Sequence, residues 1–166
     1  MIKILYVCLG NICRSPLAEA VTNAELKKLG MEDEIVCQSA GTGNWHEGER
    51  PDPRTLEIGK TYKLEFNSLA RVVTEDDFFE YDYIIVMDED NMRNVRELQP
   101  EGATAEVFMM REFDPEGGTN VPDPYFGGAQ GFENVYSILV RSVCHFLEYV
   151  MKKHVLTGNP SESRNG

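Results

Sequence analysis

The sequence is poor in positive charge and contains no long apolar run. Its 166 residues include 16 Lys and Arg against 28 Asp and Glu, a formal net charge of −12. That charge argues against nucleic-acid binding driven by the overall field. No apolar stretch approaches the roughly 20 residues of a membrane span, and residues 2–7 are too few for a signal peptide. We therefore expect a cytoplasmic protein that binds neither nucleic acid nor membrane.

Cysteine and histidine are also scarce. The four cysteines are too few and too unevenly spaced for a disulfide scaffold, so we expect free thiols in a reducing compartment. The three histidines show no ligand spacing, and we expect neither a metal nor another cofactor. The residues concerned are Cys8, Cys13, Cys37 and Cys144, of which the last two are expected on interior faces, and His46, His145 and His154.

Short apolar runs rich in β-branched residues alternate with segments of helical period along the chain. This order predicts an α/β fold with a parallel sheet. The expected strands are residues 3–7, 35–37, 83–87 and 105–109. The expected helices are residues 16–29, 54–62, 90–98 and 132–150, with Ser15 as the N-cap of the first. We expect a single domain over residues 1–156 and a loose polar tail over residues 157–166.

An acidic run at residues 75–77 has a structural explanation. Thr74 and Asp77 have the spacing of a capping box, which favours acidic residues in the first turn of a short helix. We therefore interpret the run as a solvated helix start and not as a metal site.

The loop after the first strand has the residues that phosphate chemistry requires. Gly10 and Asn11 adopt φ > 0 readily, which turns successive backbone N–H groups towards an anion. A helix beginning near Ser15 adds its positive end, and Arg14 can donate two parallel hydrogen bonds to phosphate oxygens. Among these donors Cys8 is favoured as a thiolate nucleophile.

The segment Val7-Cys8-Leu9-Gly10-Asn11-Ile12-Cys13-Arg14-Ser15-Pro16 resembles the signature of the low-molecular-weight protein tyrosine phosphatases. The likeness continues at residues 39–42, Ala70-Arg71, residues 83–88 and residues 123–125. It implies a single domain with a four-stranded parallel sheet, helices on both faces and a phosphate-binding loop after the first strand. It also implies hydrolysis of phosphotyrosine and small aryl phosphates, including acid phosphatase activity.

A proton donor must come from another part of the chain, because a phenolate is a poor leaving group. Three Asp-Pro pairs occur, at Asp52, Asp114 and Asp123. Asp123 is distinguished by flanking prolines and by the aromatic residues Tyr125 and Phe126, which can stack on a substrate ring. The resemblance implies that Asp123 is the general acid and base, Cys8 the nucleophile and Arg14 the phosphate clamp.

Further roles follow from the resemblance. It implies a phosphate-binding loop, a substrate rim, two serines that support the loop, and a redox partner for the nucleophile. Ser68 stands where the family commonly has a histidine that supports Asn11. In that order the residues are Leu9, Gly10, Asn11, Ile12, Cys13, Arg14 and Ser15; Trp45, Tyr125 and Phe126; Ser39 and Ser68; and Cys13.

Three alternatives are weighed. An arsenate reductase of the same fold needs further relay cysteines, and residues 72–96 contain none. A phosphoarginine phosphatase is suggested in relatives with threonine in place of Ile12. A non-catalytic phosphate-binding module would not need all three predicted catalytic groups. The expected partners are phosphotyrosine proteins or peptides, with inorganic phosphate as product, for a monomer or weak dimer.

Overall fold

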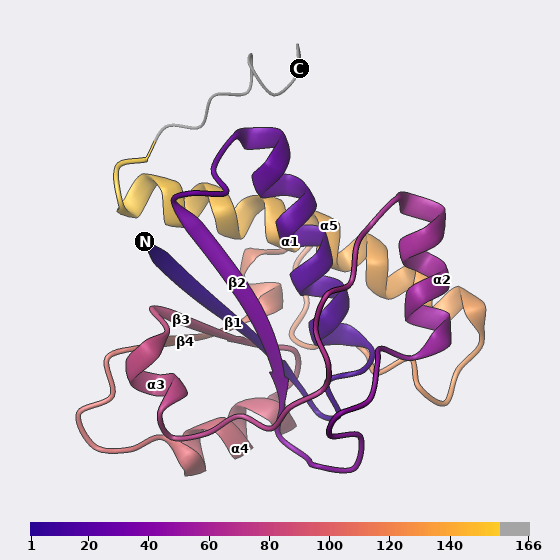
Figure 1. Ribbon diagram of the computed structural model, residues 1–166, viewed down its shortest axis with the longest axis horizontal. Coiled ribbons are helices and arrows are strands. Elements are labelled where there is room, and N and C mark those ends of the chain that lie inside the picture. The colour runs from indigo at the N-terminus through magenta and orange to yellow at the C-terminus, as the bar shows by residue number, and fades with distance from the viewer. Residues whose placement is uncertain (157–166) are drawn as a thin grey trace.

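The computed structural model describes residues 1–156 and is built on four parallel strands in the order β2-β1-β3-β4 (Figure 1). The fold class predicted from the sequence is confirmed, and the expected tail at residues 157–166 lies outside the described residues. The strands are β1 (Ile2–Cys8), β2 (Ile35–Gly41), β3 (Tyr83–Val86) and β4 (Glu106–Met109).

Helices cover both faces of the sheet. In Figure 1, α1 and α5 lie on one side of the strands, and α3 and α4 lie on the other. A short 3-10 helix, η1, follows β4 directly. The bounds are α1 (Arg14–Leu29), α2 (Pro53–Tyr62), α3 (Asp77–Glu80), α4 (Glu89–Leu98), η1 (Met110–Phe113) and α5 (Ala129–Lys153).

Successive residues of β1 face two separate apolar clusters. Ile4 and Tyr6 belong to the cluster that includes the inward faces of α1 and α5, whereas Leu5 and Val7 belong to the cluster of α3 and α4. Both faces of a parallel sheet under helices are buried, so its central strands are largely apolar. This explains why residues 4–7 of β1 show no alternation of apolar and polar residues in the sequence.

The strand order determines where a ligand can bind. From β1 the chain goes to β2 on one side and then crosses to β3 on the other, so the carboxyl ends of β1 and β3 flank a topological switch point. Cys8 is the last residue of β1, and Asp88 lies two residues beyond β3. The loops that contain these residues therefore meet at one edge of the sheet.

One residue of the acidic run at the start of α3 departs from its expected solvated state, whereas Glu75 and Asp76 are exposed as expected. Asp77 is buried, and its carboxylate accepts hydrogen bonds from both terminal nitrogens of Arg71, at 3.0 and 3.1 Å, and from the Thr74 N–H at 2.8 Å. The Thr74 hydroxyl contacts the same carboxylate instead of capping the helix. A paired guanidinium offsets the cost of burying the charge, which explains the departure.

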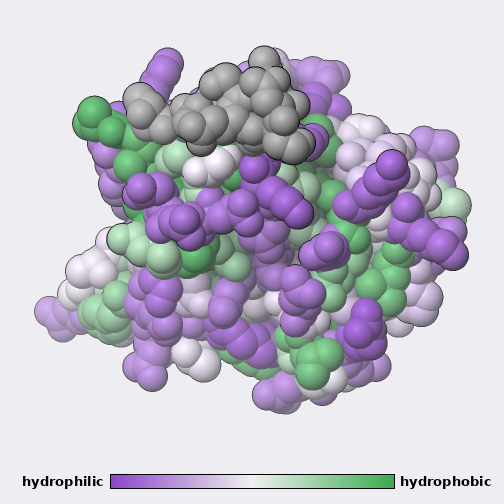
Figure 2. Space-filling model, turned by 45° about the horizontal axis from the view of Figure 1, so that its top comes forward, coloured by the Kyte–Doolittle hydropathy of each residue, from purple (hydrophilic) through white to green (hydrophobic). Residues whose placement is uncertain are grey.

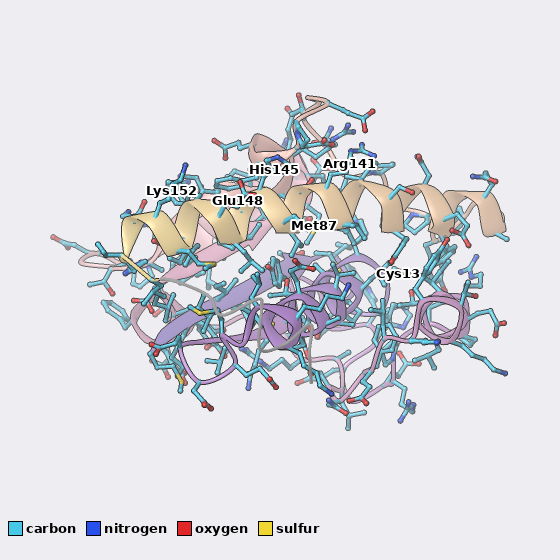
Figure 3. All side chains as sticks on the ribbon, turned by 90° about the horizontal axis from the view of Figure 1, so that it is seen from above. Cys13, Met87, Arg141, His145, Glu148 and Lys152 are labelled. Carbon is cyan, nitrogen blue, oxygen red and sulfur yellow. The ribbon has the colours of Figure 1, made fainter. Side chains whose placement is uncertain are left out.

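The outer surface is mostly polar. Figure 2 shows hydrophilic residues over most of the visible face, with hydrophobic residues in small separate groups. Figure 3 shows Arg141, His145, Glu148 and Lys152 on the side of α5 that points away from the sheet. Cys144 is half-buried on this helix, not interior as expected, whereas Cys37 is buried. Within residues 1–156, no helix has the length and apolar character needed to cross a membrane.

The buried face of α5 should carry much of the stability of the fold. Leu139 is fully buried on this face, so Leu139→Ala should lower the free energy of unfolding by about 2–5 kcal/mol through lost contacts and a cavity. Glu148→Ala, on the exposed face of the same helix, should change it by less than about 0.5 kcal/mol. Urea unfolding measures both, and equal effects would contradict this packing.

Candidate active site

The loop from Leu9 to Cys13 is held against the end of β2. Backbone N–H groups of Thr42 and Gly43 donate to the carbonyls of Cys8 and Leu9, each at 2.9 Å. Gly41 has to be glycine, because a Cβ there would lie 2.8 Å from the Leu9 carbonyl oxygen. The absence of a side chain at Gly41 therefore allows the loop backbone to pass close to the end of β2 before α1 begins.

Asn11 makes the turn of this loop. Its φ of 57° is in the left-handed region, as expected, whereas Gly10 does not take a positive φ. The Asn11 side chain is buried and donates from Nδ2 to Ser15 Oγ at 2.8 Å, while its Oδ1 accepts from the Arg71 N–H at 3.0 Å. The amide side chain thereby ties the loop to α1 and to the segment before α3.

Ser15 is not the N-cap that the sequence predicts. Helix α1 begins at Arg14, two residues before the predicted start at residue 16, with Cys13 in the cap position and no side-chain cap. The Ser15 hydroxyl lies 3.0 Å from Cys8 Sγ and 3.2 Å from the Ala40 carbonyl oxygen. Because it faces the sulfur, this hydroxyl can donate to a Cys8 thiolate, and the first N–H groups of α1 are left available to an anion.

Arg14 is buried beneath the loop at 2% exposure. Its Nη1 donates to Asp88 Oδ2 at 2.6 Å and to the Val121 carbonyl at 2.9 Å. Burial opposes its charge, yet the negative charges of Cys8, Asp88 and Asp123 raise the pKa of the guanidinium above its ordinary value. Arg14 is therefore a permanently charged group whose Nη1 is held by two acceptors.

Asp88 is a residue whose role the sequence analysis missed. Besides accepting from Arg14, its carboxylate caps α4 by accepting from the Asn91 N–H at 2.7 Å. The signal was present in the sequence, since Asp88 follows the second buried strand of the predicted site edge. One carboxylate thus connects the start of α4 to the guanidinium.

Asp123 reaches the site on a loop fixed beside β3. The Val121 N–H donates to the Met87 carbonyl at 2.7 Å. The Asp123 Oδ1 accepts from the Tyr125 N–H at 3.0 Å, and its Oδ2 lies 3.6 Å from Arg14 Nη2. The side chain is 38% exposed, so this carboxyl is open to both the pocket and solvent.

The predicted nucleophile, clamp and acid line one pocket of about 150 Å³. The predicted rim residues line it too. Trp45 is 70% exposed, and its ring covers Gly43, where a Cβ would lie 1.8 Å from the indole. The complete lining is Cys8, Leu9, Gly10, Ile12, Cys13, Arg14, Trp45, His46, Asp123, Tyr125 and Phe126.

Two thiols in this pocket have different surroundings. Cys8 is 3.0 Å from a hydroxyl, whereas Cys13 is enclosed, and burial together with the Asp52 charge raises the pKa of the Cys13 thiol to about 12. Cys13 is therefore a neutral thiol near physiological pH. Elsewhere in the chain, burial raises the pKa of Cys37 well above its ordinary value.

The two serines expected to support the loop have other surroundings. The Ser68 hydroxyl donates to Glu19 Oε2 at 2.6 Å and makes no hydrogen bond to Asn11. The Ser39 hydroxyl is buried without a hydrogen-bond partner among residues 1–156. Because the Arg71 N–H already occupies the Asn11 acceptor, Ser68 acts on α1 through Glu19 and not on the loop directly.

No group of three or more His, Cys, Asp or Glu side chains within residues 1–156 is arranged to hold a metal ion. The candidate site is accordingly built from a sulfur, a guanidinium, a carboxyl group and backbone N–H groups at a helix start. Such a set can bind a tetrahedral oxyanion and place a nucleophile beside it.

Comparison with known proteins agrees with this chemistry. A family model described as low molecular weight phosphotyrosine protein phosphatase matches residues 3–156. The chain belongs to this family. The family member of that name from Schizosaccharomyces pombe is 45% identical over 151 residues, which cover 90% of this chain and 97% of the relative.

Solved structures from the same family share the fold. A protein tyrosine phosphatase of Entamoeba histolytica, crystallised with Hepes in its active site, superposes with a TM-score of 0.89 at 37% identity. The match covers 93% of this chain and 99% of that one. An arginine phosphatase of Drosophila has a TM-score of 0.83 at 29% identity, covering 90% and 98% of the two chains. The chain is therefore a member of a hydrolase family.

The Arg14–Asp88 contact should be needed for anion binding. Asp88→Asn retains an acceptor for the α4 cap but removes the charge that fixes Arg14, so we expect affinity for inorganic phosphate to fall about tenfold. Asp90→Asn, which changes an exposed carboxylate on the same helix, is the matched control. Isothermal titration calorimetry measures the phosphate affinity of both variants. If Asp88→Asn loses no more affinity than Asp90→Asn, the Arg14–Asp88 contact is not needed for anion binding.

The buried Cys13 thiol should make stability depend on alkaline pH. The folded protein keeps this proton up to a pKa of about 12, while the unfolded chain releases it near the ordinary 9.0. Above about pH 9 the unfolded state therefore binds fewer protons, and folding stability falls by up to about 1.4 kcal/mol per pH unit. Cys13→Ala should lack this component, as unfolding free energies at pH 8 and 10 would show. If wild type and Cys13→Ala lose the same stability between pH 8 and pH 10, the Cys13 thiol does not cause the pH dependence.

Proposed function

We propose that this chain is a protein tyrosine phosphatase that hydrolyses phosphotyrosine and small aryl phosphates through a cysteinyl-phosphate. The observation that carries this proposal is the convergence of Cys8 Sγ, the Arg14 guanidinium and the Asp123 carboxyl group on one pocket in front of α1. Membership of the phosphotyrosine phosphatase family supports the substrate class. The substrates would be phosphotyrosine proteins or peptides.

In the first step, the Cys8 thiolate attacks phosphorus, and the bond from phosphorus to the tyrosine oxygen breaks. Asp123 donates its proton to that oxygen, so the leaving group departs as a phenol. Arg14 and the loop N–H groups bind the equatorial oxygens. The Arg14 guanidinium is aligned before the reaction, because the Asp88 carboxylate and the Val121 carbonyl already hold it.

In the second step, a water molecule attacks phosphorus, and the sulfur–phosphorus bond breaks. Asp123, now a carboxylate, takes the proton of that water, and inorganic phosphate leaves while the Cys8 thiolate is restored. The Ser15 hydroxyl, 3.0 Å from the sulfur, stabilises the thiolate as a leaving group. No metal or other cofactor takes part in either step.

The rim supports selection of an aromatic substrate. Trp45 and Phe126 are 70% and 94% exposed, and the Tyr125 and Phe126 rings pack edge to face at 4.9 Å. These flat apolar surfaces stand at the pocket mouth, where a phenyl ring would stack. The expectation of acid phosphatase activity rests on the resemblance to the family.

The structure of the Drosophila arginine phosphatase supports a second candidate reaction, removal of phosphate from arginine side chains. Ile12 lines the pocket of this chain and narrows it with an apolar side chain, which favours phosphotyrosine. Arsenate reduction would require a disulfide relay through further cysteines. Among the described residues, the cysteines that line the pocket are Cys8 and Cys13, so this reaction is not favoured.

The pair Cys8 and Cys13 also supports redox sensitivity. A peroxide would oxidise the Cys8 thiolate to a sulfenic acid, and the Cys13 sulfur would then displace water to form a disulfide, losing its proton. Such a bridge would protect the nucleophile reversibly. The cytoplasmic location and the monomeric or weakly dimeric state stay predictions.

Two variants test the reaction with the purified chain and no added metal. Cys8→Ser should abolish turnover of a phosphotyrosine peptide while inorganic phosphate still binds. Asp123→Asn should slow hydrolysis of phenyl phosphate by about 10²–10⁴-fold and that of an activated aryl phosphate much less, because only the poor leaving group needs the proton. Unchanged turnover by Cys8→Ser, or equal losses on both substrates for Asp123→Asn, would rule the mechanism out.

The same assay decides between substrates. We expect the phosphotyrosine peptide to be hydrolysed faster than phosphoserine or phosphoarginine peptides, and arsenate not to be reduced. A higher rate on phosphoarginine would transfer the assignment to the second candidate reaction.

A further inference from the structure

Asp114, one of the three aspartates that precede a proline, does not line the predicted active-site pocket and is buried between two guanidinium groups. Its Oδ1 accepts from Arg141 Nε at 3.0 Å, and its Oδ2 accepts from Arg111 Nε and Arg141 Nη2, each at 3.1 Å. Although burial opposes the charge, hydrogen bonds from Arg141 and from the Glu116 N–H hold the pKa of the Asp114 carboxyl below its usual range. Asp114 is therefore a fixed anion that joins η1, α5 and the loop after η1.

Arg111 uses the rest of its guanidinium to hold the loop that follows η1. Its Nη2 donates to the Gly117 carbonyl at 2.7 Å, and its Nη1 donates to the Asn120 carbonyl at 3.1 Å. Between these residues Gly118 has a φ of 108°, and a Cβ there would lie 2.4 Å from Arg111 Cζ. The guanidinium therefore packs directly on the loop backbone, and one side chain binds two of its carbonyls.

The peptide group that precedes Val121 is fixed on both sides. Its carbonyl oxygen accepts from Arg111, and its N–H donates to the Met87 carbonyl at 2.7 Å. Pro122 follows and restricts the backbone both at its own position and at Val121. A rotation of this peptide group would therefore be passed along the chain to Asp123, two residues after Val121, and would change the direction of its side chain.

Other contacts of this loop cannot replace the guanidinium. The Asn120 side chain accepts through Oδ1 from the Glu89 N–H at 2.9 Å, which ties the residue to the start of α4. A side-chain bond of this kind leaves the backbone carbonyl of Asn120 free to rotate. Residues 115–120 are exposed, so packing against the core does not hold them. The orientation of the Asn120 carbonyl therefore depends on Arg111.

We propose that Arg111 is a positioning residue for the general acid, because its guanidinium fixes the peptide group that aims Asp123 into the pocket. Asp114 in turn orients the guanidinium. The inference deepens the proposed function and rests on it. Arg111 does not line the pocket, so it acts through Asp123 and not on the substrate. Its effect should appear in proton donation to the leaving group and much less in phosphate binding.

The experiment compares Arg111→Gln with wild type on two substrates. We expect kcat/KM for phenyl phosphate to fall about tenfold and that for an activated aryl phosphate less than about twofold, because only the poor leaving group needs a well-placed proton donor. Affinity for inorganic phosphate, measured by calorimetry, should change little, because Arg14 keeps its contact with Asp88. Equal losses of kcat/KM on the two substrates would overturn the proposal.

Two further variants separate positioning from charge and from stability. Arg111→Lys keeps a positive charge beside Asp114 but lacks the fork that binds two carbonyls, so it should show the same substrate-dependent loss. Arg141→Gln is the matched control. The Arg141 side chain contacts the carboxylates of Asp114 and Glu116 and, within residues 1–156, no carbonyl of the loop. This variant should lower the free energy of urea unfolding and leave the ratio of the two kcat/KM values unchanged. Full activity of Arg111→Lys, or an altered ratio in Arg141→Gln, would contradict the proposal.

A double variant tests whether Arg111 acts through Asp123. When Asp123→Asn has already removed the acid, adding Arg111→Gln should lower kcat/KM for phenyl phosphate by less than about twofold more. If the two losses multiply instead, Arg111 acts independently of Asp123 and the proposal is wrong.

The same series separates this inference from the proposed function. A wild type that does not hydrolyse phenyl phosphate, or an Asp123→Asn variant with equal losses on both substrates, would refute the proposed function and the role of Arg111 with it. If wild type and Asp123→Asn behave as proposed and Arg111→Gln behaves like wild type, only the positioning role of Arg111 is overturned.

Discussion

A guanidinium buried at the end of a parallel sheet connects the separate segments of this site. Arg14 belongs to the first turn of α1, and it is held by the Asp88 carboxylate after β3 and by the Val121 carbonyl of the later loop. A buried cation without such partners would cost several kcal/mol. The same contacts that make its burial tolerable therefore align the clamp and bring the loop of Asp123 towards Cys8.

The loop between Cys8 and Arg14 depends on a second set of contacts that point away from the pocket. Asn11 takes a left-handed conformation and links Ser15 to Arg71, while the Ser15 hydroxyl lies beside the sulfur. These bonds use side chains and the Arg71 N–H, and none of them uses an N–H group of the loop itself. The local dipoles can then attract an anion to a protein whose overall charge repels it.

The sequence was sufficient for the fold, and it predicted Cys8, Arg14 and Asp123, which the structure brings to one pocket. Apolar runs predicted the four strands, and the residue types after the first strand predicted a phosphate pocket, because these features depend on neighbours in the chain. It was insufficient where a role is decided by distant partners. Ser15 has the pattern of an N-cap, but its hydroxyl faces Cys8. Asp77 is buried by Arg71, and His46, which lines the pocket, has no local pattern that reveals this position.

The claim on which this account depends is that the Cys8 sulfur becomes bonded to phosphorus during turnover. Rapid acid quench of the enzyme with a phosphotyrosine peptide, followed by peptide mass spectrometry, tests it directly. We expect one phosphoryl group on the peptide that contains Cys8, formed within a single turnover and absent in Cys8→Ser. Product formation at the full rate with no phosphoryl group on that peptide, or with the group on another residue, would contradict the account.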